Sequence, residues 1–336
     1  MEGIELKIKY KLKSKILKLK FIDPTYAVVR ASARKGQLLS DQQLIDLASS
    51  RDLKEFLNRA KERYPALALN VTPSLKEVED LLLKAFGEEV DEFIKMCPDA
   101  SPILRLIKRE IEGEEAVDLL KQHLGILGAE DKGQPKKGGK ENVSDQLSAM
   151  SFSLEVKEAR RMFEKYKIPA MVDSVFARYR ILKMFDAAKN LGGGSAKQLR
   201  EYLRLKIDVF NVITVLRGIR NGIDRTALEE ILIPRGGSVG KEDLVGALKQ
   251  ADEGKALAYL REVGLPKVED VRAVERSYEK EISKTLTDTY YHGYADVGAI
   301  VGYLELRLRE VRDLIRIANG ISRGMEPKRI AQDFIF

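Results

Sequence analysis

The chain has 336 residues, of which 44% are apolar and 33% are charged, with a net charge of +7 and a single cysteine. That apolar content is ample for packed cores, while one cysteine, Cys97, excludes a disulfide framework. No apolar run approaches the ~18 residues of a membrane-spanning helix, so we expect none. The basic balance permits a nucleic acid, an anionic membrane surface or an acidic protein as partner.

The N-terminal arm, residues 1–20, is rich in lysine. Its lysines are Lys7, Lys9, Lys11, Lys13, Lys15, Lys18 and Lys20. Basic and apolar residues alternate with a period of two as far as Ser14, which favours an extended segment over an amphipathic helix. Two interpretations remain open: contact with anionic lipid headgroups, or a solvated arm without a partner.

Helical periodicity dominates the rest of the chain, and no series of alternating strands occurs, so the sequence predicts an all-α fold. The clearest predicted helices are Leu75–Phe86, Met171–Ala188, Ser195–Gly222, Val274–Tyr291 and Val297–Ile321. The Gly- and Lys-rich stretch Gly128–Asn142 is either a linker or a loop inside a repeat.

One helical pattern occurs three times, about a hundred residues apart, starting at Glu115, Asp208 and Glu310. Each copy has an acid at position 0, Asn or Asp at +3, an apolar residue at +4 and Gly at +10. The second and third copies add an apolar residue at +7 and a further Gly at +14. These offsets fall on one stripe of a helix, which identifies a repeat protein.

The repeat closes on itself. Residues 40–65 match the segment that begins at Gly240 with an offset of 200, whereas the third copy ends without such a tail. We therefore predict three similar helical units: residues 66–169, residues 170–266, and residues 267–336 completed by residues 1–65. An open solenoid would instead need capping repeats at its ends.

The polar stripe has two interpretations. Its acids, amides and glycines either form a seam where helices approach closely, or line a shared cavity that receives a partner. The helical periodicity is compatible with both.

Residues that could carry chemistry are scarce. The segment PRGGSVGKED has three residues between Gly236 and Gly240 where a phosphate loop needs four, and Glu242 stands where Ser or Thr would bind magnesium. His123 and His292 are the only histidines, with no partner at metal-ligand spacing. We expect no cofactor, no metal and no active site.

Three segments carry a family resemblance. They are LRLKIDVFNVITVLRGIRNGID followed by ILIPRGG, the closing YLELRLREVRDLIRIANGISRGM, and the opening YAVVRASARKGQLLS. The matching residues are Tyr26, Arg30, Leu38, Leu39, Ile207, Asp208, Asn211, Val215, Leu216, Arg217, Gly236, Gly237, Glu305, Arg307, Glu310, Asp313, Leu314, Ile317 and Gly320. Through these residues the chain resembles the C subunit of archaeal and bacterial A/V-type ATP synthases, the counterpart of the d subunit in the vacuolar ATPase.

The resemblance implies a pseudo-threefold funnel of three helical units, without an active site. It further implies a central-rotor subunit that links the membrane proteolipid ring to the central shaft and transmits torque between ion flow and ATP synthesis or hydrolysis. Such a subunit would lie peripherally on the cytoplasmic face of the cell membrane.

Arg30, Arg217 and Arg220 are the candidate shaft-binding residues. Arg217 and Arg220 fall in the last turn of a predicted helix, and Arg30 takes the matching place in the N-terminal copy. They would present positive charge to an acidic shaft tip, or simply complement the negative end of the helix dipole.

Two rival functions remain. A basic helical nucleic-acid binder would gather its Lys and Arg on one face, whereas outside the arm they are interspersed with Asp and Glu. A helical scaffold unrelated to a motor would need capped ends.

Overall fold

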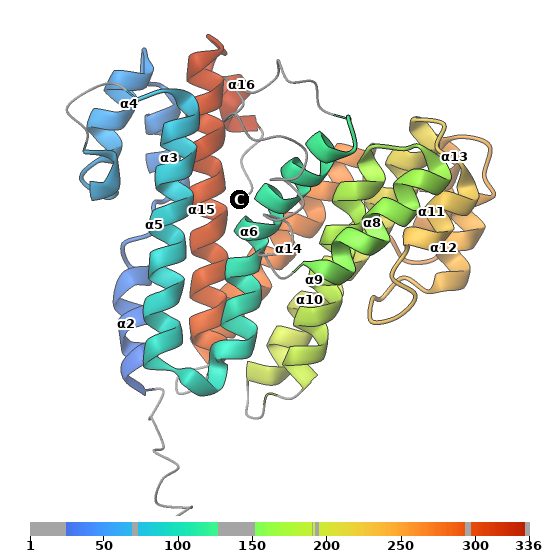
Figure 1. Ribbon diagram of the computed structural model, residues 1–336, viewed down its shortest axis with the longest axis horizontal. Coiled ribbons are helices and arrows are strands. Elements are labelled where there is room, and N and C mark those ends of the chain that lie inside the picture. Colours follow the sequence, from blue (N-terminus) through green and yellow to red (C-terminus); the bar gives the residue numbers. More distant parts are fainter. Residues whose placement is uncertain are drawn as a thin grey trace, which may run out of the picture.

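The computed structural model (Figure 1) describes residues 25–68, 73–126, 152–189, 191, 195–292 and 297–332. Within these ranges every regular element is a helix, which confirms the all-α prediction. None of the helices in these ranges combines the length and the apolar character needed to span a bilayer. The lysine-rich arm and the stretch Gly128–Asn142 lie outside the described residues.

Six long helices form the body of the molecule: α5 (Leu75–Met96), α6 (Ser101–His123), α9 (Ala170–Lys189), α10 (Ser195–Arg220), α14 (Val271–His292) and α15 (Val297–Ser322). The five predicted helices are therefore confirmed, with small shifts at their ends and one larger extension. α5 runs ten residues past Phe86, through Gly87, because its buried face continues with Val90 and Phe93.

The long helices pack in a closed circuit (Figure 1). α5 packs on α6, α6 on α9, α9 on α10, α10 on α14, α14 on α15, and α15 back on α5. Helices consecutive in the chain form the pairs α5/α6, α9/α10 and α14/α15. One continuous hydrophobic core runs between them, from Ala27 to Ile330. Each long helix thus has neighbours on two sides.

Shorter helices cover the outside of this circuit. α8 (Ser153–Tyr166) packs on α9, and α11 (Arg225–Ile231), α12 (Lys241–Leu248) and α13 (Glu253–Glu262) pack on α10. α15 carries α2 (Thr25–Lys35), α3 (Asp41–Ala48), α4 (Leu53–Ala60) and α16 (Pro327–Gln332). Two 3₁₀ turns, η1 (Pro65–Leu67) and η2 (Pro98–Ala100), flank α5.

The short helices in the two segments that match at an offset of 200 residues have similar lengths, caps and packing. α3 and α12 both span eight residues, and their N-caps are Ser40 and Gly240. Asp52 and Asp252 cap α4 and α13, each accepting a hydrogen bond of 2.8 Å from the backbone N–H three residues later. α3 and α4 pack on α15 as α12 and α13 pack on α10. The division into three units and the pseudo-threefold funnel stay predictions.

The register predicted for the first copy of the repeat is wrong by one helical turn. Gly125, Gly222 and Gly324 all follow the end of a helix with positive φ, at 70°, 64° and 63°. After each of them, the next backbone N–H donates at 2.9 Å to the carbonyl five residues earlier, as in a Schellman cap. Gly125 therefore corresponds to Gly222 and not to Gly218. Glycines one turn apart share a helix face, so spacing alone did not separate the two registers.

The mid-helix glycines of the stripe allow close packing. A Cβ at Gly218 would lie 2.4 Å from Leu228 of α11, and one at Gly320 would lie 2.6 Å from Ile330 of α16. The short helix that follows each of the two long helices is therefore seated against a glycine.

Candidate functional site

The acid and amide of the second copy hold a loop. The carboxylate of Asp208 on α10 accepts hydrogen bonds from the backbone N–H of Ser238, at 2.8 Å, and of Val239, at 3.0 Å. Asn211, one turn along, both donates to and accepts from the backbone of Ile233, at 2.9 and 2.8 Å. Both side chains are buried. The Ser238 and Val239 amides of the IPRGGSVG segment therefore point at a carboxylate of the protein itself.

The third copy uses its acid in the same way. Glu310 on α15 accepts a hydrogen bond of 3.1 Å from the backbone N–H of Leu39, the residue before the N-cap of α3. Burial raises the pKa of Glu310, and Arg307, at 3.2 Å, opposes that shift. The interpretation of the stripe as a seam between packed elements is thus confirmed for the second and third copies.

The first copy differs. Glu115, predicted as its acid, is exposed, and Asp118 is only half-buried. The buried acid of α6 is instead Glu110, five residues earlier and 1% exposed. Its environment is ionic, whereas Asp208 is held by backbone amides.

Glu110 lies at the centre of a group of charges contributed by several long helices. Its Oε1 is 2.8 Å from a guanidinium nitrogen of Arg312 on α15 and 3.1 Å from one of Arg180 on α9. Burial alone would raise the pKa of Glu110, but Arg180, Arg312 and Lys206 together hold it well below the usual range. The carboxyl is therefore ionised inside the protein, where an unpaired charge would be strongly destabilising.

A second buried acid continues this group. Glu305 on α15 accepts a hydrogen bond of 2.5 Å from the hydroxyl of Tyr202 on α10, and its Oε2 is 3.8 Å from Nζ of Lys206. Burial and the neighbouring Glu305 raise the pKa of Tyr202 well above its ordinary value, so the phenol stays protonated as a donor. We name Glu110, Arg180, Tyr202, Lys206, Glu305 and Arg312 the central charge cluster.

Another cluster joins the N-terminal helices to the body. Glu89 on α5 pairs with Arg34 of α2 at 2.9 Å and with Arg307 of α15 at 3.2 Å, and it accepts a hydrogen bond from Tyr303. Arg307 also donates to the hydroxyl of Tyr64 at 2.7 Å. Several of these contacts bridge sequence separations above 200 residues, so helical periodicity carried no sign of them.

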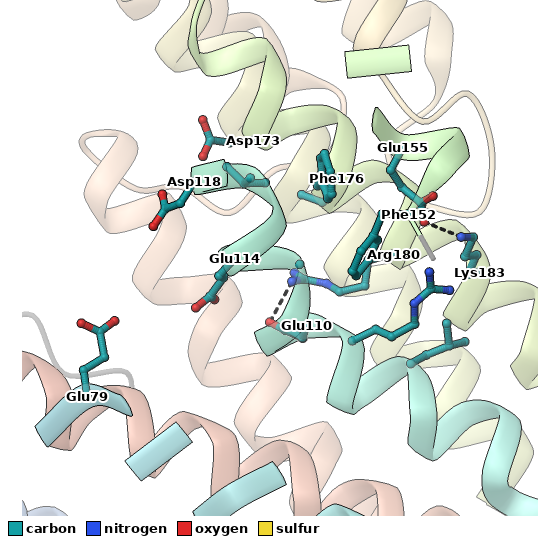
Figure 2. Close-up of a pocket in the computed structure, with 15 residues that line it drawn as sticks. Glu79, Glu110, Glu114, Asp118, Phe152, Glu155, Asp173, Phe176, Arg180 and Lys183 are labelled. Atoms are coloured by element: carbon teal, nitrogen blue, oxygen red, sulfur yellow. Dashed lines mark hydrogen bonds and ion pairs between the residues drawn. The ribbon is translucent and has the colours of Figure 1, made fainter. Parts of the chain in front are cut away.

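A cavity of about 300 Å³ lies between α6, α8 and α9 (Figure 2). Phe152 and Phe176, Glu110 with Arg180, and the ion pair of Lys183 with Glu155 occupy one side of it. The other side is acidic, with Glu79, Glu114, Asp118 and Asp173. No group of His, Cys, Asp and Glu side chains in the described ranges is arranged to hold a metal ion.

The three predicted shaft-binding arginines do not lie together. Arg217 pairs with Glu275 of α14 at 2.7 Å, and Arg220 lies 3.7 Å from Glu253 of α13. Arg30 pairs with Glu92 of α5 at 3.0 Å and sits in the middle of α2, whose last-turn cations are Arg34 and Lys35. α2 and α13 lie on opposite sides of the molecule in Figure 1. The predicted match between Arg30 and a helix end is wrong, while Arg217 and Arg220 do lie in a last turn.

A carboxylate on α11 connects two helices that are distant in sequence. Glu230 contacts Arg161 at 2.7 Å, Lys165 at 2.8 Å and the hydroxyl of Tyr166 at 2.5 Å, all three on α8. The hydrogen bonds from Lys165, Tyr166 and Arg161 lower the pKa of Glu230 to about 2. The contact between α8 and α11 therefore depends on an ionised carboxyl.

We expect Glu230→Gln to lower the free energy of unfolding at neutral pH by about 1 kcal/mol, since the group is largely solvated. A lowered pKa stabilises the folded state above the ordinary glutamate range, and this contribution is lost as the pH falls through about 2. Urea unfolding of both proteins from pH 7 to pH 2.5 should therefore show the difference shrinking below pH 4.5. Glu229→Gln, an exposed neighbour, is the control; a pH-independent difference for Glu230→Gln would contradict the assignment.

Comparison with known proteins gives a consistent result. The family model described as ATP synthase (C/AC39) subunit matches residues 27–333. Among similar proteins, the C subunit of the A-type ATP synthase of Thermococcus kodakarensis is 24% identical, covering 93% of this chain and 90% of that protein. Its counterpart in Thermococcus onnurineus is 25% identical over the same shares, and that in Desulfurococcus sp. is 24% identical over 93% and 91%.

Proposed function

Because the chain belongs to the ATP synthase (C/AC39) subunit family, we propose that it joins the membrane proteolipid ring of an A-type rotary ATP synthase to the central shaft. It would transmit torque between ion translocation and ATP synthesis or hydrolysis, and would itself catalyse no reaction. We place it peripherally, on the cytoplasmic face of the cell membrane.

The closed circuit of six long helices is the observation that best supports this role. A part that transmits torque must resist twisting, and each long helix here is supported by neighbours on two sides. The central charge cluster links α6, α9, α10 and α15, and burial makes these ion pairs costly to separate. Rotation of one helix pair against another would have to break these contacts.

A reconstituted complex with and without the protein tests the proposal. Without it, we expect the catalytic head to hydrolyse ATP while ATP-driven ion transport into vesicles falls to background, because head and ring are no longer joined. Adding back the purified protein should restore ion transport. Coupled transport in its absence would refute the proposed role.

We further propose that Arg217 and Arg220, at the end of α10, contact an acidic shaft surface, and that Arg30, on a distant helix, does not share that contact. Their side chains are 54% and 64% exposed despite their ion pairs, so they remain accessible. The double variant Arg217→Gln/Arg220→Gln should bind the isolated shaft about tenfold more weakly and with a flatter dependence on salt.

The stability of this double variant should change by less than about 1 kcal/mol, because exposed ion pairs contribute little. Lys280→Gln/Lys284→Gln, which removes the same charge from the exposed face of α14, is the matched control and should bind normally. Equal binding by both variants would exclude the contact.

No observation favours nucleic-acid binding or an unrelated scaffold. Residues 1–20 hold seven lysines and two glutamates, a net +5, which leaves only +2 for the rest of the chain. A body with that balance has no strong electrostatic attraction for a polyanion. The packing of α2, α3 and α4 on α15 is also unlike an open stack of repeats with capped ends.

A further inference from the structure

The cavity between α6, α8 and α9 carries a surplus of negative charge. Of the fifteen residues that line it, six are acidic and three are basic. The protein as a whole has a net charge of +7, so its acids are locally concentrated around this cavity. A concave site with this balance attracts cations.

Three of the acids form a row along α6. Glu110, Glu114 and Asp118 are four residues apart, so they lie on one face of the helix. An α-helix rises about 1.5 Å per residue, which separates successive members of the row by about 6 Å along its axis. Gly113 and Val117 line the cavity between them. The wall formed by α6 therefore alternates charged and apolar positions at a fixed spacing.

The row begins with a buried carboxyl that has unused hydrogen-bonding capacity. Glu110 is 1% exposed, and its Oε2 accepts no hydrogen bond from any residue that the structure describes. The ion pairs of Glu110 with Arg312 and Arg180 are at Oε1. Because a buried acceptor without a donor is destabilising, a donor that enters the cavity and reaches Oε2 would be stabilised there.

The outer acids of the cavity remain accessible. Figure 2 shows Glu114, Asp118 and Asp173 along the same side of it. The side chains of Glu114 and Asp173 are 51% and 52% exposed, although each has an ion pair of 2.7 Å, with Arg312 and Lys121 respectively. A carboxylate offers about four acceptor positions, so one ion pair does not saturate it. These groups can therefore receive further donors.

The opposite side of the cavity is aromatic. The ring centres of Phe152 and Phe176 are 5.6 Å apart, and the guanidinium of Arg109 lies 4.5 Å from that of Phe152. Arg180 and Lys183, the other basic residues of the lining, are ion-paired with buried acids. Phenyl rings contact methylene groups favourably, and their faces attract cations. A ligand that fits both sides combines several positive charges with apolar segments between them.

We infer that this cavity is a binding site for a linear polyamine. Its ammonium groups would pair with the carboxylates on α6, and its methylene chain would lie against the phenyl rings. Four methylenes separate two ammonium groups by nearly the rise of four residues of an α-helix. A metal ion would need ligands that converge on one point, and no such group occurs among the residues that the structure describes. The inference does not depend on the proposed role in torque transmission.

Isothermal titration calorimetry with the full-length protein tests the inference. Spermidine should bind saturably, one molecule per protein, at about 0.1 M salt. Hexaamminecobalt(III) has the same charge in a compact form that reaches one carboxylate at a time, so it should bind about tenfold more weakly. Among diamines, the compound with four methylenes should bind more tightly than the compound with two. Absence of saturable binding, or equal affinity for the compact ion, would overturn the inference.

A charge-matched pair of variants locates the site. Glu114→Gln/Asp118→Asn should weaken spermidine binding about tenfold, and Glu114→Gln alone about threefold, because each lost ion pair is partly solvated. The control is Glu115→Gln/Asp80→Asn, which removes the same charge at two exposed residues outside the cavity and should bind normally. Circular dichroism and melting temperature check that each variant is folded. An equal loss of affinity in both double variants would show a diffuse counterion effect and would overturn the inference.

Discussion

Replacing Arg312 by methionine is expected to lower the free energy of unfolding by about 3 kcal/mol. The loss arises mainly at Glu110, which is fully buried and keeps only Arg180, at 3.1 Å, as a close ion-pair partner. Removing one member of a buried ion pair typically costs about 3–5 kcal/mol, and the remaining arginine places this case at the lower end. Denaturant unfolding at neutral pH measures the difference.

The double variant Glu110→Gln/Arg312→Met should recover part of the loss, because the isolated charge is gone. Since the pKa of Glu110 is held well below its usual range, the wild-type contribution is present at neutral pH and declines only in strong acid. Arg204→Met, at an exposed pair with Glu201 on α10, is a control and should change stability by less than about 1 kcal/mol. If Arg312→Met were as stable as Arg204→Met, the role of the central charge cluster would be contradicted.

Asp208→Ala should lower the free energy of unfolding by about 3–5 kcal/mol. Hydrogen bonds to a charged acceptor contribute about 1.5–3 kcal/mol each, and two backbone N–H groups, of Ser238 and Val239, would lose theirs. Hydrogen exchange should accelerate at these two amides first. Asp208→Asn keeps one acceptor oxygen and the volume of the side chain, so we expect an intermediate loss.

The helix-capping residue Asp224 provides a comparison for the loss of stability expected in Asp208→Ala. It accepts a hydrogen bond of 2.9 Å from the N–H of Ala227 at the start of α11, and Asp224→Ala should cost about 1 kcal/mol. If Asp208→Ala were no more destabilising than Asp224→Ala but impaired binding of the shaft, Asp208 would line a partner site and the seam interpretation would fail.

The secondary structure was predictable because its causes are local. Apolar residues at helical spacing predicted α9, α10, α14 and α15 to within a few residues. The offset of 200 between Ser40 and Gly240 anticipated the matching short helices α3 and α12, since capping and periodicity act within a few residues of the chain. Where two glycines shared one face, as at Gly218 and Gly222, the same local rule was ambiguous and the first copy was misaligned.

The candidate sites were predicted unevenly. Asp208 and Glu310 stood out as acids at one position of a repeat, and both hold the backbone of another segment. Glu110 and Glu305 were missed because neither occupies that position and their partners come from other helices, 70 to 202 residues away. The prediction that Arg30 lies at a helix end, as Arg217 and Arg220 do, was wrong because similarity of a short sequence does not fix the distance to the end of a helix.

The sequence by itself determined the helical fold, the family and the concentration of positive charge in the N-terminal arm. The fold class follows from spacing along the chain, the charge from composition, and the family from the resemblance of three segments, and none of these depends on how helices meet. Only the tertiary structure decided that the six long helices close into a circuit and that Glu110 is buried against two arginines. A carboxylate in a helical sequence is ordinarily solvated, and it becomes part of a buried ion pair only when packing removes water and brings a cation from another helix to it.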